Sequence, residues 1–369
     1  METSTQPTVS AVIVTYNRLE LLKESIAAVL AQDTDALSHV IVVNNMSTDG
    51  TGEYLDDLAK TEPKLLVVHA TENGGGAGGF NLGMRAFGEQ TNDKYVWLMD
   101  DDTIPQPEAL GRLVTWYERH PKTGFLTSNV RWGSIDGRPA WMNVVNPRGF
   151  EWPEMAADEG AIEVVNATFV SVLISRDIVK LIGLPQKEFF IWGDDIEYTN
   201  RAADVYRGYF IPGAIVVHKS KENTYPGNIV LEKDASRMWR YRYEFRNRVL
   251  SARRVGRRAY VDTIINNFRF DLKHTLLGKS VKFRFKKAGM IISSTLKGIS
   301  FNPEIEYLFG QKPDYVRSIS VIEHGRAQLD GEVEKETGEK PYEFKTREEM
   351  EAILREKGMP TTKAEKGKM

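Results

Sequence analysis

Short apolar segments alternate with helical segments through the first hundred residues, and this alternation constrains the fold more than any other feature. The apolar runs cover residues 10–16, 39–45, 65–70 and 95–102, and amphipathic helical segments cover 18–32 and 51–60. Strands joined by helices pair in parallel, with helices on both faces of the sheet. We therefore predict an α/β fold with a mostly parallel central sheet that binds ligands at the carboxyl ends of its strands.

The rest of the chain divides by charge. Residues 1–225 hold 19 Lys+Arg against 31 Asp+Glu, residues 226–310 hold 18 against 7, and residues 311–369 hold 12 against 13. The middle part is rich in arginine, lysine and aromatic residues and reads as helical. In the polar last part, a capping box and a glycine predict one short helix at 346–358. We therefore expect an acidic α/β domain, a basic helical region and a polar tail.

The composition also excludes several kinds of chemistry and location. The chain contains no cysteine, so disulfides, thiolate metal sites and cysteine nucleophiles are absent. Its N-terminus is polar, and no apolar run reaches the ~20 residues of a membrane-spanning helix. We expect a soluble or peripheral protein, and a cytoplasmic location fits.

Three aspartates, Asp100 to Asp102, end the fourth apolar run. Adjacent carboxylates repel one another unless a cation offsets their charge. In extended backbone alternate side chains share a face, so Asp100 and Asp102 converge while Asp101 points away. A solvated acidic turn is the alternative. The apolar strand running directly into the acids favours Mg²⁺ or Mn²⁺, bound together with the phosphates of a nucleotide.

A glycine-rich segment from Asn73 to Phe80 leads into a predicted helix at 78–87. Glycines at a strand-to-helix junction let backbone amides approach a phosphate at the helix N-terminus. The segment is neither the GxGxxG fingerprint that follows a first strand nor a Walker loop, because no Gly-Lys-Ser/Thr follows it. A flexible surface turn explains the segment equally well when it is taken alone.

Acidic and aromatic residues adjoin between Phe190 and Tyr198. Asp194 and Asp195 follow Phe, Ile and Trp, surroundings that raise the pKa of a carboxyl and suit a general base. Either acid could instead cap a helix, and both roles hold if one caps and the other is catalytic. His218 ends the apolar run AIVVH, where a lone histidine is more often structural than a metal ligand.

Together these motifs resemble those of family 2 glycosyltransferases of the GT-A type, most closely bacterial galactofuranosyltransferases and the related rhamnosyltransferases. The resemblance covers roughly residues 9–250 and rests on VIVTYNR, VVNNMSTDGT, NGGGAGGFNLGM, WLMDDDT, FIWGDDIEY and, less specifically, YRYEFRNR. It implies a Rossmann-like, nucleotide-sugar-binding GT-A catalytic domain over 1–225, a helical C-terminal region and a bound Mn²⁺ or Mg²⁺.

The resemblance also assigns roles to residues. It places donor binding at Thr15, Tyr16, Asn17, Arg18, Asn45, Asp49, Asn73, Gly74, Gly78, Gly79 and Asp101. It matches Asp100, Asp102 and His218 to metal ligands. It matches Asp195, with Asp194 beside it, to the catalytic base, and Trp192 to a wall of the acceptor site. The chain departs from the usual pattern at Asn44, where such proteins carry an acid.

The chemistry of these residues agrees with sugar transfer. A divalent ion offsets charge on a leaving diphosphate, and one base activates the acceptor hydroxyl for in-line attack with inversion. The expected donor is UDP-galactofuranose, with dTDP-rhamnose as the alternative, and the expected acceptor is a glycan or a lipid-linked glycan. A non-catalytic sugar-nucleotide sensor is the rival from another class. A nucleotidyltransferase is disfavoured, because TYNRLELL lacks the expected glycine-rich loop.

The basic segment at 237–258 interleaves arginines with aromatic residues. It could bind nucleic acid, but no recognition motif accompanies it. It could pair with the acidic domain. We favour a third interpretation, in which it binds an anionic membrane surface and holds the protein on the inner face of the plasma membrane.

Overall fold

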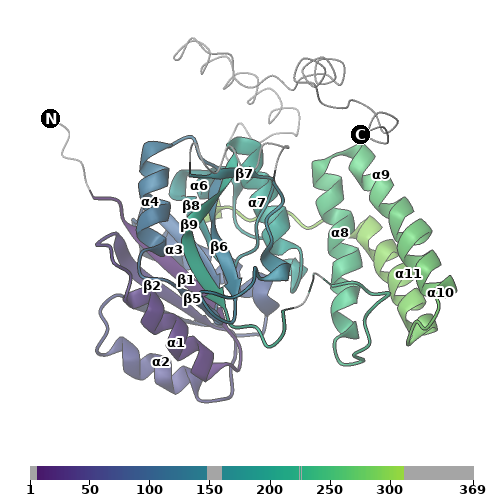
Figure 1. Ribbon diagram of the computed structural model, residues 1–369, viewed down its shortest axis with the longest axis horizontal. Helices are drawn as coiled ribbons and strands as arrows, with labels where there is room; N and C mark the ends of the chain where they lie inside the picture. The colour runs from purple at the N-terminus through teal and green to yellow at the C-terminus, as the bar shows by residue number, and fades with distance from the viewer. Residues whose placement is uncertain (1–5, 148–159, 224, 226, 311–369) are drawn as a thin grey trace, which may run out of the picture. The chain divides into compact units, whose positions relative to one another are not determined.

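The structure is a computed structural model that describes residues 6–147, 160–223, 225 and 227–310 (Figure 1). The helix predicted at 346–358 lies outside the described residues. None of the described helices combines the length and the apolar character that a bilayer crossing requires.

The first half of the sheet confirms the predicted alternation. Its elements are β1 (Val9–Thr15), α1 (Leu19–Leu30), β2 (Leu37–Asn44), α2 (Thr51–Ala59), β3 (Leu65–His69), α3 (Gly75–Gln90) and β4 (Tyr95–Asp100). The four strands are parallel and lie in the order β3-β2-β1-β4. Because Val14 pairs with Asp100, the carboxyl ends of β1 and β4 lie side by side.

The second half of the sheet mixes strand directions. Its strands are β5 (Thr103–Pro105), β6 (Phe125–Trp132), β7 (Ile162–Val164), β8 (Val172–Ser175) and β9 (Gly208–His218). β8 is antiparallel to both β4 and β6, while β9 is parallel to β6 and antiparallel to β5 and β7. The pairing of Thr103 with His218 brings the end of β9 to the three aspartates.

Helices cover both faces of the sheet (Figure 1). α1 and α4 (Ala109–Arg119) pack into one core with the side chains of β1 that point their way, such as Ile13. α3, α6 (Arg176–Ile182) and α7 (Asp194–Val205) pack into the other core, with Val12 and Val14. The strands are buried on both faces, which explains their continuous apolar runs.

The region after residue 226 is helical, as expected. It contains α8 (Tyr241–Val255), α9 (Arg257–Asn266), the π-helix η4 (Asn267–Leu272), α10 (Lys273–Leu277) and α11 (Arg284–Ser300). Short 3-10 turns lie at η1 (Trp141–Asn143), η2 (Lys187–Phe189), η3 (Met238–Arg240) and η5 (Leu308–Gly310). α8 packs against both α9 and α11, and Phe245 of α8 and Ile291 of α11 lie in one core.

The glycine-rich segment is more helical than predicted. α3 begins at Gly75, three residues before the predicted start at 78, so Gly75 to Ala77 belong to the helix and not to a loop before it. A Cβ atom on Gly79 would lie 2.3 Å from Cγ1 of Val14, and one on Gly83 would lie 2.4 Å from Cγ1 of Val12. These two glycines therefore let α3 press directly against β1.

We expect Gly79→Ala to destabilise the fold by about 1–3 kcal/mol, because its methyl group overlaps a buried side chain of β1. Gly76→Ala is the matched control in the same helix, since no atom lies within 4 Å of its added Cβ. The control should be neutral or stabilising by up to about 1 kcal/mol, because alanine favours helix. Urea unfolding midpoints measure both changes, and equal midpoints for the two variants would contradict the close-packing explanation.

Candidate functional site

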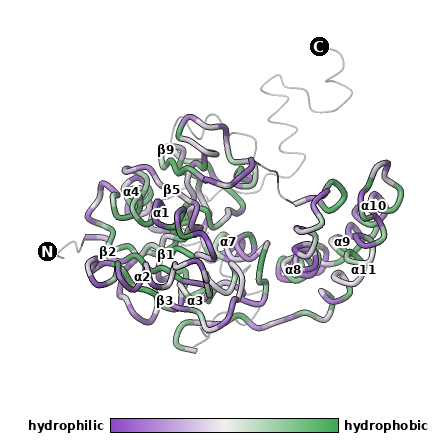
Figure 2. Tube along the Cα trace, turned by 90° about the horizontal axis from the view of Figure 1, so that it is seen from below, coloured by the Kyte–Doolittle hydropathy of each residue, from purple (hydrophilic) through white to green (hydrophobic). Residues whose placement is uncertain are grey.

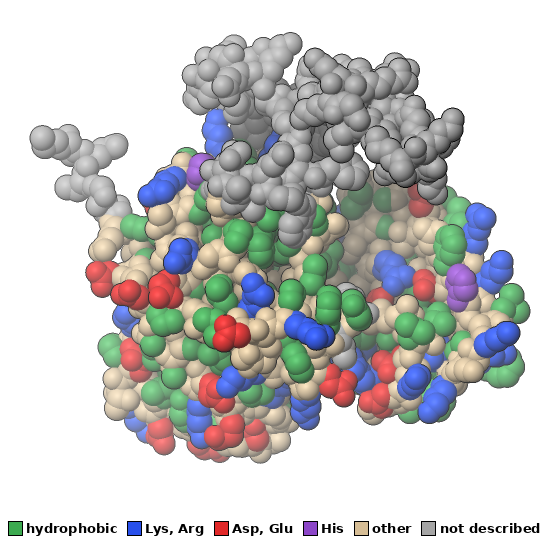
Figure 3. Space-filling model, viewed as in Figure 1, with side chains coloured by type: hydrophobic (Ala, Val, Ile, Leu, Met, Phe, Trp, Pro, Cys, Tyr) green, Lys and Arg blue, Asp and Glu red, His purple; other side chains and the backbone are tan. Residues whose placement is uncertain are grey.

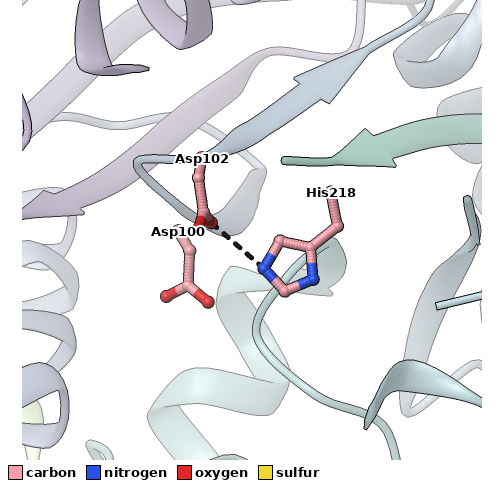
Figure 4. A group of neighbouring side chains, drawn as sticks. All are labelled: Asp100, Asp102 and His218. Carbon is pink, nitrogen blue, oxygen red and sulfur yellow. Dashed lines mark ion pairs between the residues drawn. The ribbon is translucent and has the colours of Figure 1, made fainter. Parts of the chain in front are cut away.

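Two aspartates and a histidine meet at the carboxyl edge of the sheet (Figure 4). Asp100 ends β4, Asp102 follows it, and His218 ends β9. One ligand atom from each residue lies within 4.8 Å of the other two, and His218 Nε2 lies 3.1 Å from Asp102 Oδ1. Asp102 and His218 are buried, and Asp100 is partly buried. The structure thus brings together the three residues that the sequence matched to metal ligands.

The atoms of this cluster fit a divalent cation. Oδ1 of Asp102 is buried, and its close polar neighbour among the described residues is His218 Nε2, at 3.1 Å. His218 Nδ1 lies 2.9 Å from Oδ1 of Asn143, an acceptor, so Nδ1 carries a proton, and Nε2, which faces Asp102, is the nitrogen that would bind a metal ion. Two carboxylates and one imidazole nitrogen therefore face the same small space, a donor set that a divalent cation takes readily.

The electrostatics of the cluster point the same way. Burial raises the pKa of Asp100 to about 7, and the charge of Asp102 adds to the effect. Burial also opposes ionisation of Asp102, but His218 and Arg18 outweigh it and lower the pKa of this carboxyl. Burial tends to lower the pKa of His218, and its contact with Asp102 more than reverses this. The carboxylates of Asp100 and Asp102 repel each other when both are charged, and bound protons offset this repulsion here. A bound cation would offset it in their place.

Asp101 faces away from the cluster and fastens two strand ends together. Thr15 Oγ1 donates to Asp101 Oδ2 at 2.8 Å, and Arg18 Nη1 donates to Asp101 Oδ1 at 3.1 Å. Arg18 Nη1 also lies 2.8 Å from Asp102 Oδ2. Burial raises the pKa of Asp101 to about 6 although Arg18 favours its charged form. The role of Thr15 and Asp101 in binding the donor substrate stays a prediction. In this structure the two side chains bind each other.

Asn45 holds the start of the glycine-rich segment. This buried side chain donates through Nδ2 to Asn73 Oδ1 at 3.1 Å and to the Gly75 carbonyl at 3.0 Å. Its Oδ1 accepts from the Gly74 amide at 3.2 Å. Asn73 in turn accepts from the Gly75 amide at 2.9 Å. The structure therefore gathers these predicted donor residues, with Asn45 and Asn73 oriented toward the loop backbone.

Asp49 and Asn17 make local contacts of the same kind. Asp49 accepts from the Leu19 amide at 3.0 Å and from Thr51 Oγ1 at 2.6 Å, so it ties together the starts of α1 and α2. Asn17, in the left-handed region with φ 53°, accepts from the Thr48 amide at 2.7 Å. Both residues thus shape the loops after β1 and β2.

Two predicted donor residues keep an open side. The Tyr16 side chain is 48% exposed. A Cβ atom built on Gly78 would meet no atom within 4 Å, in contrast to Gly79. Space for a ligand therefore lies beside Gly78, at the start of α3, where helix amides favour phosphate.

The predicted base lies at the start of α7, immediately after Gly193. Burial raises the pKa of Asp194 well above its ordinary value, and Asp195 and Asp100 add to the effect. Burial raises the pKa of Asp195 to about 6, although the Ile196 amide at 2.7 Å favours its charged form. Asp194 is buried and Asp195 only partly so. Asp195 therefore combines access with a pKa near neutrality, as a general base requires.

The loop before Asp194 is backbone-strained. Phe190 and Trp192 have φ of 64° and 65°, a conformation that costs a non-glycine residue roughly 1–3 kcal/mol and persists only where the surroundings enforce it. The Phe190 carbonyl accepts from the Ala77 amide at 3.2 Å, which ties this loop to α3. Trp192 packs edge-on against Tyr241, with ring centroids 5.2 Å apart.

Asn247 of α8 holds the loop from the other side, and the sequence analysis did not single out this residue. Its Nδ2 lies 3.0, 3.2 and 2.9 Å from the carbonyl oxygens of Phe189, Ile191 and Trp192. Asn247 is buried, and its Oδ1 accepts from Arg246 Nε at 3.1 Å. The motif YRYEFRNR was the available signal, but it was interpreted as part of a basic surface.

Comparisons with known proteins agree with this arrangement. A family model described as "Glycosyl transferase family 2" matches residues 10–182. An undecaprenyl-phosphate mannosyltransferase of Micrococcus luteus is 37% identical over 225 residues, which cover 61% of this chain and 90% of that protein. The galactofuranosyltransferase GlfT1 of Mycolicibacterium smegmatis is 28% identical over 214 residues, which cover 52% of this chain and 64% of that protein. A match to an uncharacterized glycosyltransferase of Haemophilus influenzae covers 34% of its length, so the chain spans less than two thirds of these last two relatives.

Solved structures share the fold. GalNAc-T7 with UDP, GalNAc and Mn²⁺ superposes with a TM-score of 0.54 at 12% identity, over 78% of this chain and 55% of that one. Residues 1–349 of S. aureus TarS in complex with UDP-GlcNAc give a TM-score of 0.53 at 16% identity, over 79% and 81%. These likenesses confirm the predicted GT-A fold.

We expect the affinity for Mn²⁺, measured by calorimetry in the presence of UDP, to weaken as the pH falls from about 8 to about 6. Asp100, with a pKa of about 7, is ionised at the upper end and protonated at the lower end, where it no longer offers a ligand. The loss should approach about tenfold per pH unit for each proton that competes with the ion. Asp100→Asn should abolish binding and the exposed change Asp136→Asn should not, while a pH-independent affinity would contradict this site.

We expect Asn247→Asp to lower kcat by about 10²-fold with little change in the KM for the donor, because it turns a carboxylate toward three carbonyls and shifts the loop before Asp195. Asn267→Asp is the matched control. Asn267 is also buried in the helical region and donates to Thr295 Oγ1 at 3.1 Å, away from the loop. The control should lower the Tm without lowering kcat, and equal kcat losses in both variants would show a general structural effect instead.

Proposed function

The chain belongs to glycosyltransferase family 2, and we propose that it is an inverting, metal-dependent enzyme that transfers a sugar from a nucleotide-sugar to a hydroxyl group of a glycan or lipid-linked glycan. One observation carries the proposal. The Asp100–Asp102–His218 cluster lies at the carboxyl ends of β4 and β9, with its three ligand atoms within 4.8 Å of one another. In addition to burial, the charge of Asp100 raises the pKa of Asp194 at the start of α7, which supports a single site for the cluster and the proposed base.

The chain's own residues divide the work. Asp100, Asp102 and His218 would hold the cation, which when bound offsets charge on the leaving diphosphate. Asp195 accepts the proton of the acceptor hydroxyl as the new glycosidic bond forms and the bond to the diphosphate breaks. A single displacement with one base inverts the anomeric configuration. Trp192, in a strained loop beside that base, offers a wall for the acceptor.

The preferred donor is UDP-galactofuranose. The similarity to GlfT1, 28% identical over 52% of this chain, supports this choice, and the motif resemblance keeps dTDP-rhamnose as the alternative. The similarity to an undecaprenyl-phosphate mannosyltransferase supports an acceptor linked to a lipid. Such an acceptor would bring the enzyme to the inner face of the plasma membrane, for work on cell-wall or surface polysaccharide.

The test is UDP or dTDP release from a panel of UDP- and dTDP-sugars, with Mn²⁺ and then with EDTA. We expect release from UDP-galactofuranose that EDTA abolishes. Asp195→Asn should lower kcat by about 10²–10⁴-fold while donor affinity stays unchanged, because the variant loses only the proton acceptor.

The other outcomes separate the rival functions. Turnover of dTDP-rhamnose alone would keep the mechanism and replace the donor. Binding of a nucleotide-sugar with no metal-dependent turnover, acceptor extract included, would favour a non-catalytic sensor. Full activity of Asp195→Asn would remove this residue from the role of base.

A further inference from the structure

The helices after α8 expose large apolar side chains to solvent. We define the outer helical face by six of these residues: Val261, Ile265, Leu277, Phe285, Ile292 and Leu296. Leu277 is 72% exposed and Phe285 is 83% exposed. Single exposed apolar residues are ordinary, but a series of them along neighbouring helices marks a binding surface.

α11 shows the pattern most clearly. Ile292, Leu296 and Ile299 follow a spacing of four and three residues and are all exposed, so they form one stripe on the helix. The opposite side, with buried Ile291 and Gly298, packs against α8, where a Cβ on Gly298 would lie 2.8 Å from Cβ of Val249. A helix that is apolar on two sides is adapted to burial on both, yet the described residues cover only one side of α11.

Basic residues are frequent in the same part of the chain. From 255 to 300 the chain holds 10 Lys+Arg against 2 Asp+Glu. Both acids are engaged with arginines, Asp262 with Arg258 at 3.8 Å and Asp271 with Arg248 at 3.0 Å. Figure 2 shows hydrophilic and hydrophobic stretches alternating along these helices, and Figure 3 shows hydrophobic and basic side chains intermixed over them. The face therefore combines apolar and positive character.

The arginines of 237–258, from which membrane binding was predicted, are largely used inside the protein. Arg246 donates to the carbonyls of Glu188 and Phe189, and Arg254 binds Glu197. Arg253 donates to the Phe301 carbonyl at 2.8 Å. These guanidinium groups join α8 to its surroundings, so the structure favours a surface further along the chain.

We propose that the outer helical face docks on an anionic lipid bilayer. Its apolar side chains enter the headgroup boundary and the flanking lysines bind lipid phosphates, as in interfacial amphipathic helices. The positive charge argues against the other occupants, because a second copy would bring like charges together and the tail at 311–369, with 12 Lys+Arg against 13 Asp+Glu, offers little to neutralise them. The inference rests on the proposed function only for the lipid-linked acceptor, which supplies the reason for docking.

The absence of cysteine from the chain allows a direct test on the full-length protein. Leu277→Cys and Phe285→Cys are each labelled with an environment-sensitive fluorophore and mixed with phosphatidylcholine vesicles, with or without phosphatidylglycerol. We expect a blue shift only with the anionic vesicles. Ile135→Cys, at a position 46% exposed on the α/β domain, is the matched control and should not shift.

A charge series completes the test. Reversing Lys279, Lys282 and Lys286 to glutamate should weaken vesicle binding by more than about tenfold at low salt, because an anionic surface attracts each lysine and repels each glutamate. Reversing Lys60, Arg112 and Arg119 on the α/β domain should leave vesicle binding unchanged. Equal losses in both triple variants would show a non-specific charge effect and overturn the assignment.

Two further results would overturn the proposal. One is a label that is already blue-shifted without vesicles and does not respond to them, which would mean that the tail or a second copy covers the face. The other is no shift with any vesicle. Donor hydrolysis in solution, measured on the same proteins, separates these failures from failure of the proposed function, because hydrolysis needs no membrane.

Discussion

Repulsion among three consecutive carboxylates at the end of β4 is the constraint around which the site is built. The neighbours that offset it come from the ends of two other strands. Thr15 and Arg18 follow from β1, which is parallel to β4, and His218 comes from β9 through its pairing with β5. The alternation of side chains splits the acids, so that Asp101 closes the contact to β1 while Asp100 and Asp102 face His218. The same pattern therefore serves both stability and chemistry.

The sequence predicted the parts of this arrangement that depend on local pattern. Apolar runs with clear ends predicted β1 to β4 and their helices, because strands buried on both faces need uninterrupted apolar residues. Three acids directly after such a run predicted a cluster of negative charge at the carboxyl ends of the strands. The proximity of His218 to that cluster came from the family resemblance, since nothing local to a histidine at the end of β9 tells which strand lies beside it.

The parts that depend on contacts distant in sequence were not predictable in this way. The antiparallel half of the sheet is set by pairings such as that of β8 with β4, which no turn motif specifies. The sequence places Gly79 in a helix, but the reason for a glycine there is its close approach to Val14, which only the folded chain shows. Asn247 lies 55 or more residues from the carbonyls that it binds, so its role exists only in the folded chain. Arginines near it look like a surface cluster for the same reason.

The loop that carries Trp192 is hydrogen-bonded to α3 through the Ala77 amide and to α8 through Asn247. This double attachment limits which parts of such enzymes can be exchanged during evolution. A recombination event that exchanged everything after residue 225 would separate the strained loop from the asparagine that stabilises it. Exchange of C-terminal regions between relatives should therefore succeed only where the loop and its asparagine are inherited together. The segments of this protein that must be inherited together therefore lie on both sides of residue 225, where the charge composition changes.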